Sequence, residues 1–477
     1  MKKTPIKRNE AKLLFLENEQ VASSFRDPSG FVFFLNGAIY RQINKSYQEN
    51  YDLLIKSGLY DKLVSLGYLI PHQEVELTKI SAEAYKIIQP QKIPFISYPY
   101  EWCFSMLKAA ALLTLTIQKT ALEYGCSLKD GSSFNIQFLE GKPILIDTLS
   151  FEKYEEGRPW IAYKQFVEHF LTPLALMSMT DIRLNRLSSL FINGIPIDLA
   201  SRLLPFRSRF KPSLLFHIHA HSSSQKRFAQ KKLTDAQIQH SFGRRAFMGL
   251  LDNLENTVKS LSWSSKGTQW SDYYKEDNNN YNLQSLTQKV EAVRSFIKAI
   301  KPKIVWDMGA NTGYFSRVAV ETKALVISFD NDYGALENNY LEMVKNQEKN
   351  ILPLFCDLSN PNPALGWANQ ERQSLFERGP ADVILALALV HHLAISQNLP
   401  LIFIGSLFAK LSTYLIIEFI PKEDSQVQKL LMNRQDIFPN YTKESFEKIF
   451  REFFQIKKIC PIDKSKRILY LMEKKQR

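Results

Sequence analysis

Residues 305–316 read Val-Trp-Asp-Met-Gly-Ala-Asn-Thr-Gly-Tyr-Phe-Ser, an acidic side chain followed by a glycine-rich turn. At Gly309 and Gly313 a ligand could approach the backbone where a Cβ atom would clash. A helix that begins after the turn would offer unpaired N–H groups to an anion, here a ligand carboxylate. Asp307 would face a ligand cation such as an ammonium group. The turn therefore predicts a binding site for a small molecule that carries both charges.

Two further acidic positions follow at the ends of apolar runs. Asp330 lies 23 residues after Asp307, and dinucleotide-binding folds use an acid at a similar separation to hold a ribose hydroxyl pair. Asp332 competes with Asp330 for this role. Asp357 could accept a hydrogen bond from an adenine amino group, or it could only cap the turn that begins at Ser359.

These side chains need a sheet to bring them together, and residues 291–477 predict one. Short β-branched runs alternate there with amphipathic stretches, which is typical of a parallel α/β sheet. We expect strands at 303–307, 325–330, 352–357, 382–389 and 413–419, helices at 313–322, 334–346, 398–411 and 445–453, and a closing hairpin from 454–459 and 467–472.

The order of these features resembles the class I S-adenosylmethionine-dependent methyltransferases. The residues that carry the resemblance are Asp307, Gly309, Asn311 and Gly313 in the first motif, Asp330 for the ribose, and Asp357 with Leu358 for the adenine. Residues 386–393, Ala-Leu-Ala-Leu-Val-His-His-Leu, also look like the matching strand of many small-molecule methyltransferases. The resemblance implies an α/β fold class with a Rossmann-like seven-stranded sheet, S-adenosylmethionine as cofactor, and methyl transfer to an acceptor.

An NAD(P) site is the alternative interpretation of the turn. The glycine spacing is G-x-x-x-G rather than G-x-G-x-x-G, and Asp307 would repel a pyrophosphate. Both observations favour the methyltransferase.

Methyl transfer needs alignment of acceptor, methyl group and sulfur, and a base if the acceptor is an alcohol or an acid. His391 and His392 are candidate bases because histidine titrates near neutrality, and Glu418 is a third; all three could instead be structural. No Asn/Asp-Pro-Pro-Tyr/Phe motif follows the fourth strand, which disfavours amino-group and nucleic-acid-base acceptors. We expect an oxygen-directed reaction, with small molecule, glycan, lipid and protein acceptors left open.

Four phrases define a narrower resemblance, namely residues 306–309, 391–395, 418–422 and 436–439. They are similar to bacterial methyltransferase-like proteins related to a rhizobial nodulation host-specificity protein. This resemblance does not identify the acceptor.

The amino-terminal half contains a second pattern. Asp130, Asn135 and Asp147 have a spacing similar to the catalytic and metal-binding residues of protein kinases, after an expected helix at 102–124. The region therefore resembles a kinase-like fold, which implies ATP and magnesium if it is active. No His-Arg precedes Asp130, and Thr-Leu follows Asp147. The alternative is a β-hairpin, from 134–139 and 143–146, whose Asp and Asn residues form turns.

Basic residues are concentrated in one window. The chain has a net charge of +13, and residues 201–250 contain ten basic side chains against one acid, Asp235. The window predicts a docking surface for an anionic partner, which could be an anionic acceptor, a phosphate-rich partner or a membrane surface, with nucleic acid as a further alternative. His217, His219 and His221 would share one side of a strand, but they have no carboxylate partner nearby, and we predict no metal site.

The 477 residues suggest three regions: an α+β domain at 1–200, a basic and polar connection at 201–290, and the methyltransferase domain at 291–477. Four scattered cysteines exclude a disulfide scaffold. No apolar run approaches the ~18 residues of a membrane span, so we expect a cytoplasmic protein. We also expect an aromatic lid over the cofactor or acceptor, formed by Trp270, Tyr273, Tyr274 and Tyr281.

Overall fold

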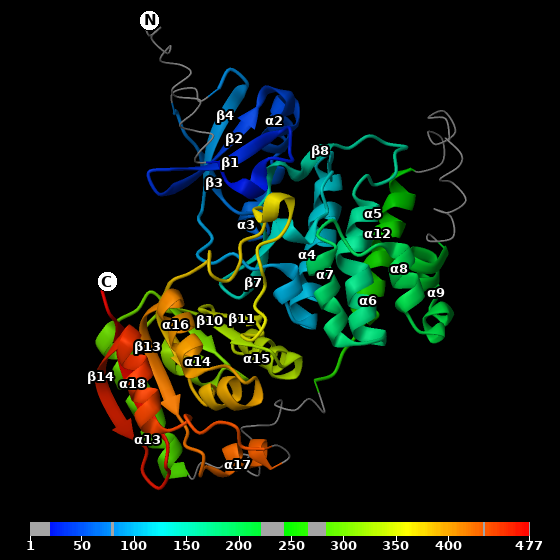
Figure 1. The fold of residues 1–477 in the computed structure, drawn as a ribbon. Coiled ribbons are helices and arrows are strands. Elements are labelled where there is room, and N and C mark those ends of the chain that lie inside the picture. Colours follow the sequence, from blue (N-terminus) through cyan, green and yellow to red (C-terminus); the bar gives the residue numbers. More distant parts are fainter. Residues whose placement is uncertain (1–19, 78–80, 221–242, 266–282, 433–434, 477) are drawn as a thin grey trace, which may run out of the picture. The chain divides into compact units, whose positions relative to one another are not determined.

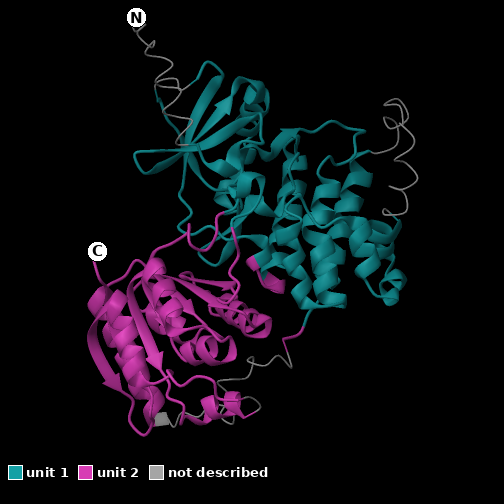
Figure 2. Cartoon of the chain, in the orientation of Figure 1, with its two compact units in different colours: residues 1–100, 106–263, 364–372 teal, residues 101–105, 264–363, 373–477 magenta. Residues whose placement is uncertain are grey.

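The computed structural model describes residues 20–77, 81–220, 243–265, 283–432 and 435–476. The chain forms two compact units (Figures 1 and 2). Unit 1 comprises residues 1–100, 106–263 and 364–372, and unit 2 comprises residues 101–105, 264–363 and 373–477. The four predicted lid aromatics, Trp270, Tyr273, Tyr274 and Tyr281, lie outside the described residues, as does His221.

Two short segments belong to the unit that holds the other half of the chain. The segment that begins at Glu101 is part of unit 2, where the buried carboxylate accepts hydrogen bonds from Arg378 at 2.6 and 2.9 Å. The segment that contains Glu371 is part of unit 1, where its carboxylate binds Arg26 Nε at 3.0 Å. Each segment is therefore fixed by an ion pair within its unit.

Unit 2 is built on a seven-stranded sheet, which confirms the predicted fold. The strand order is β11-β10-β9-β12-β13-β15-β14. The first five strands are parallel to one another, and β15 is antiparallel to both of its neighbours, β13 and β14. The parallel strands are apolar and buried, as expected for a sheet covered on both faces. The strands are β9 (Ile304–Met308), β10 (Leu325–Asp330), β11 (Ile351–Phe355), β12 (Ala381–Ala386), β13 (Ser412–Phe419), β14 (Phe454–Pro461) and β15 (Ile468–Lys474).

Helices alternate with these strands. Two of them, α13 and α14, share a buried core with β9, β12, β13 and β15 that includes Val293, Phe315, Val305 and Leu385. The sequence did not predict α13 or α17. The helices are α13 (Leu283–Ile300), α14 (Tyr314–Val320), α15 (Tyr333–Lys345), α16 (Leu401–Leu411), α17 (Ser425–Leu431) and α18 (Lys443–Phe453).

Unit 1 begins with an antiparallel sheet of order β1-β2-β4-β3, followed by a helix and the predicted hairpin. Helices α2 (Gln48–Lys56) and α3 (Leu59–Ser65) lie between β2 and β3 in sequence. The strands are β1 (Gly30–Leu35), β2 (Ala38–Asn44), β3 (His72–Glu74) and β4 (Ala84–Pro90). The elements that follow are α4 (Phe104–Glu123), the hairpin β6 (Ile136–Leu139) and β7 (Lys142–Leu145), and the pair β5 (Cys126–Leu128) and β8 (Phe151–Lys153).

The rest of unit 1 is helical. It contains α5 (Tyr163–Phe166), α6 (Thr172–Met179), α7 (Leu187–Leu190), α8 (Ile197–Leu203), the 3-10 helix η8 (Phe206–Phe210), α9 (Pro212–Leu214), the π-helix η9 (Leu215–Ala220) and α12 (Arg244–Ser260). None of the described helices in either unit is long and apolar enough to cross a membrane.

His217 and His219 do not lie in a strand, the arrangement that would have put them on one side, because both residues belong to η9. Both imidazoles are buried and hydrogen-bonded: His217 Nδ1 lies 2.8 Å from the hydroxyl of Tyr163, and His219 Nε2 lies 2.8 Å from Oγ of Ser208. Among the described residues, no group of three His, Cys, Asp or Glu side chains could hold a metal ion. The two histidines are therefore internal anchors.

Candidate functional site

A cavity of about 330 Å³ lies in unit 2, at the carboxyl ends of the parallel strands. In this sheet β9 and β12 are neighbours although β10 and β11 separate them in sequence, and open α/β sheets bind their ligands at such a switch point. The wall contains residues from the turn after β9, from the ends of β10 and β11, and from the segment after β12, namely Gly309, Asn311, Asp330, Asn331, Cys356, Asp357, Leu358, Ser359, Leu387, Ala388, Leu389, His391, His392 and Leu393.

The two glycines of the first motif serve different purposes. Gly309 lines the cavity with a left-handed φ of 76°, and a Cβ atom there would lie 3.4 Å from Cδ1 of Leu389. Gly313, with φ of 81°, is not among the cavity-lining residues. A Cβ atom on Gly313 would come within 2.3 Å of Oδ1 of Asn339. Gly309 keeps the backbone open to a ligand, whereas Gly313 allows α14 to pack against α15.

Asp330, at the end of β10, is one of two acids in the cavity wall, the other being Asp357. Its Oδ2 accepts a hydrogen bond from the backbone N–H of Asn311 at 2.7 Å, and its Oδ1 accepts one from that of Asp332 at 2.8 Å. Burial raises the pKa of Asp330 to about 6. The competing candidate, Asp332, instead caps α15 by accepting from the N–H groups of Gly334 and Ala335. The geometry favours Asp330 as the ribose acid.

Asp307 does not line the cavity, although the sequence suggested that it faces a ligand cation. Its carboxylate is buried, and Oδ2 accepts a hydrogen bond of 2.6 Å from the hydroxyl of Ser316 on α14. That hydroxyl also lies 2.7 Å from the hydroxyl of Ser328 on β10. Burial raises the pKa of Asp307 to about 7. In this structure Asp307 joins α14 to the sheet, and a role in binding a ligand stays a prediction.

Asp357 and Leu358 both line the cavity, after β11. Oδ1 of Asp357 accepts hydrogen bonds from the backbone N–H and the hydroxyl of Ser359, at 2.9 and 2.6 Å. Asp357 therefore caps the turn that begins at Ser359, which was the alternative to a role in adenine binding. Because it also lines the cavity, the prediction that it accepts from an adenine amino group stays open.

His391 and His392 lie side by side after β12, and both line the cavity. Their ring centroids are 4.2 Å apart. Burial lowers the pKa of His392 to about 4 and the pKa of His391 well below its usual value. His391 is 2% exposed, and its Nδ1 has no hydrogen-bond partner in the described part of the chain. Both rings are therefore neutral at pH 7.

Glu418, the third candidate base, is not among the residues of the cavity wall. It ends β13, where it is fully buried, and Oε2 accepts hydrogen bonds from Nζ of Lys289 at 2.7 Å and from the backbone N–H of Ala388 at 2.8 Å. Burial lowers the pKa of Lys289. The structure thus places Glu418 in an internal ion pair that supports the segment after β12.

Sequence reasoning missed Lys289 and Arg467. Lys289 lies in the apolar stripe of α13, between Leu286 and Val293. A lone lysine within an apolar helical pattern could have indicated a buried, paired charge. Arg467 lines the cavity just before β15 and is buried, with Nε 2.8 Å from Oδ2 of Asp424. No local sequence pattern indicates that Arg467 would line a cavity, because the residues of the hairpin around it form no recognisable motif.

In unit 1 the structure brings the three kinase-like residues into one neighbourhood. Asp147 pairs with Arg41 of β2 at 2.5 Å and accepts from the hydroxyl of Ser150 at 2.7 Å, and Asn135 also donates to Ser150 at 3.3 Å. Burial, followed by the nearby charge of Asp147, raises the pKa of Asp130. The carboxylate of Asp147 is thus held by donors of its own chain, and phosphotransfer stays a prediction.

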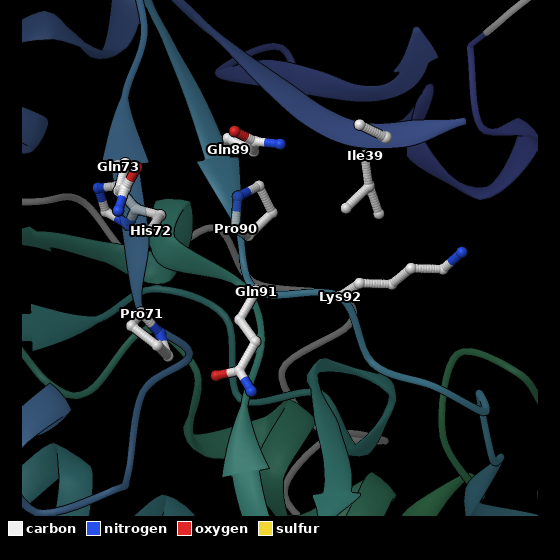
Figure 3. A pocket seen from close by; sticks show the side chains of 9 residues that line it. Ile39, Pro71, His72, Gln73, Gln89, Pro90, Gln91 and Lys92 are labelled. Carbon is white, nitrogen blue, oxygen red and sulfur yellow. The ribbon is translucent and has the colours of Figure 1, made fainter. Parts of the chain in front are cut away.

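A second hollow, of about 540 Å³, lies on unit 1 beside β3 and β4 (Figure 3). It is lined by side chains that include Ile39, Pro71, His72, Gln89 and Lys92. Burial lowers the pKa of His72 to about 4, so the only imidazole in this wall is neutral. None of the predicted site residues lies in this hollow.

Comparison with known proteins gives one relative along nearly the whole chain. No protein-family model matches. The chain is 35% identical over 466 residues to the nodulation protein NoeA of Rhizobium meliloti (strain 1021), covering 96% of each chain.

Among solved structures, the chain is similar to the magnesium protoporphyrin IX methyltransferase of Synechocystis PCC 6803 with bound SAH, with 17% identity and a TM-score of 0.30. This match covers 41% of the present chain and 90% of the other. The methyltransferase domain of a bacterial Hen1 gives 16% identity and a TM-score of 0.31, covering 40% and 100%.

Proposed function

The chain belongs to the family of the nodulation protein NoeA and carries a domain with the class I methyltransferase strand order, and from this premise we propose that unit 2 binds S-adenosylmethionine and transfers its methyl group to an acceptor. The observation that carries the proposal is the cavity at the switch point between β9 and β12, where Gly309, Asp330 and His391 share one wall.

The residues of the wall suit this cofactor. Gly309 and Asn311 both line the cavity and both have left-handed backbone conformations, and Gly309 carries no Cβ atom that would limit the approach of a ligand. The carboxylate of Asp330 is buried against the cavity and can accept further hydrogen bonds from a ribose diol. Asp357 can accept from an exocyclic amino group. When bound, S-adenosylmethionine supplies an electrophilic methyl group on a sulfonium centre.

We propose that the acceptor atom is oxygen. His391 lines the cavity with a buried imidazole whose Nδ1 has no hydrogen-bond partner among the residues that the structure describes. Because its lowered pKa keeps the ring neutral, one ring nitrogen can accept a hydrogen bond from an acceptor hydroxyl and orient the oxygen lone pair. Arg467, Gln426 and Leu430 extend the same wall and would contact the body of the acceptor. A small molecule or a glycan with a free hydroxyl fits this proposal.

The test has two stages. Calorimetry with the full chain should show binding of S-adenosylmethionine, and incubation with the labelled cofactor and fractionated cell extract should label an acceptor that mass spectrometry can identify. His391→Asn should lower the rate of labelling more than tenfold while cofactor affinity changes little. Absence of cofactor binding by the folded wild-type chain would refute the proposal.

The cluster in unit 1 supports a second candidate function, binding of ATP with magnesium. The supporting observation is that two carboxylates and one amide, Asp130, Asp147 and Asn135, lie in one neighbourhood with Arg41. Binding would require the pair of Arg41 and Asp147 to open. A thermal-shift series with ATP and magnesium chloride, on wild type and Asp147→Asn, tests this function, and a flat response of the wild type would exclude it.

A further inference from the structure

Part of the helical region of unit 1 exposes large apolar side chains. Five of them lie between residues 203 and 216, with exposed fractions of 37% for Leu203, 71% for Phe206, 74% for Phe210, 44% for Leu215 and 60% for Phe216. They belong to α8, η8 and η9, which pack against one another, and α8 and α9 lie together at the rim of unit 1 (Figure 1). Scattered exposed leucines are ordinary, but five such side chains in one short segment mark an interaction surface.

Buried hydrogen bonds hold this segment in place on the side that faces the core of unit 1. His219 lies within 2.9 Å of Oγ of Ser201 and within 2.8 Å of Oγ of Ser208, and so connects α8, η8 and η9. His217 lies within 2.8 Å of Oδ1 of Asn253 on α12. These hydrogen bonds fix the backbone that carries the exposed apolar side chains.

The same segment is positively charged. Residues 201–220 contain Arg202, Arg207, Arg209 and Lys211 and no acidic residue, and all four basic side chains are exposed. The guanidinium of Arg209 lies 5.9 Å from the ring centroid of Phe206, so charge and aromatic surface are adjacent. We call these four basic side chains and the five exposed apolar side chains, Leu203, Phe206, Phe210, Leu215 and Phe216, the aromatic–basic surface.

We propose that the aromatic–basic surface docks the protein onto an anionic phospholipid bilayer. Aromatic and aliphatic side chains next to arginine and lysine are typical of surfaces that enter the headgroup region, where apolar groups leave water and cations meet lipid phosphates. The charge of the segment matches an anionic lipid, and its branched aliphatic side chains gain little from a nucleic acid. Because no described helix could span a membrane, the association is peripheral.

The experiment is sedimentation of the full chain with vesicles of phosphatidylcholine alone or of phosphatidylcholine with phosphatidylglycerol. We expect binding to the anionic vesicles at low salt and at least tenfold weaker binding to the neutral ones. Phe206→Ser with Phe210→Ser should lower the affinity for anionic vesicles at least tenfold, and Arg209→Glu with Lys211→Glu should do the same. All four positions are exposed, and circular dichroism checks that the variants remain folded.

Phe403→Ser provides the matched control, because Phe403 is an exposed phenylalanine, 64% accessible, on α16 of unit 2. It should leave vesicle binding unchanged. Equal loss in the control and in the Phe206 and Phe210 variant would overturn the proposal, as would failure of the wild type to bind anionic vesicles. Salt-sensitive binding to duplex DNA or RNA that the same variants abolish, without vesicle binding, would assign the surface to nucleic acid instead.

Discussion

One oxygen of Glu418, Oε2, accepts hydrogen bonds from both Nζ of Lys289, at 2.7 Å, and the backbone N–H of Ala388, at 2.8 Å. Ala388 lines the cavity and has a left-handed φ of 50°, which is unfavourable for a residue with a Cβ atom. The hydrogen bond from Ala388 therefore stabilises an unfavourable backbone conformation, and the ion pair fixes the carboxylate that accepts it beside the cavity.

Replacing Glu418 with Gln should destabilise the protein by about 3–5 kcal/mol, because it leaves the buried ammonium of Lys289 without its counter-charge. Urea unfolding measures the change. The double variant Lys289→Met with Glu418→Gln should recover much of the loss. Glu321→Gln is the control, since it removes an exposed ion pair with Arg294, and should cost at most about 1 kcal/mol. A stable Glu418→Gln variant would show that the pair does not hold this region together.

Asp330→Asn should weaken S-adenosylmethionine binding at least tenfold in calorimetry, because the carboxylate that faces the cavity becomes an amide with one acceptor oxygen. Asp382→Asn is the matched control. Oδ2 of Asp382 also accepts from two backbone N–H groups, those of Lys303 and Ile304, but Asp382 does not line the cavity. The control should retain cofactor affinity, and equal losses in both variants would indicate a purely structural effect.

Alanine substitutions at Gly309 and Gly313 should affect cofactor affinity and the free energy of unfolding to different extents. Gly313→Ala should be the more destabilising change, because its Cβ atom would collide with Asn339 and Arg317 in addition to the ~1–2 kcal/mol for left-handed backbone. Gly309→Ala should cost less stability but should weaken cofactor binding more. Chemical denaturation and calorimetry on both variants decide this, and the reverse order in either measurement would contradict the assignment.

The pKa of about 7 for Asp307 predicts a pH-dependent contribution to stability. The native state retains a proton that the unfolded chain releases near pH 4, so the stabilisation is present at low pH and is lost as pH rises toward 7. The free energy of unfolding of the wild type, relative to Asp307→Asn, should therefore fall between about pH 4 and pH 7, by on the order of 1.4 kcal/mol per pKa unit, and level off above that range. A difference that stays constant with pH would show that Asp307 does not titrate in this range.

The sheet of unit 2 was predictable because its signals are local. A buried parallel strand needs an unbroken apolar run, and β10 was predicted at 325–330, the bounds that the structure has. The turn after β9 needs left-handed residues, and glycine marks two of them, Gly309 and Gly313. Such features depend on a few neighbouring residues, so one sequence is enough to recognise them.

The rest of the site depends on contacts between distant residues. Lys289 and Glu418 are 129 positions apart, and a lysine at one position does not indicate where in the sequence its glutamate partner lies. The same holds for Arg467 with Asp424. The alternation of His217 and His219 would have placed both on one side of a strand, but their hydrogen bonds to Tyr163 and Ser208 stabilise a π-helical turn instead.

Residues 101–105 belong to unit 2 and residues 364–372 belong to unit 1, which limits where the chain can be divided into two fragments. A chain cut between residues 263 and 264 would leave Glu101 on one fragment and Arg378 on the other, each a buried charge without its partner. Glu371, which is buried, would likewise lose Arg26, whose side chain is 53% exposed. Each fragment would lack a segment of its own unit, so we expect separately produced halves to fold only when they are combined.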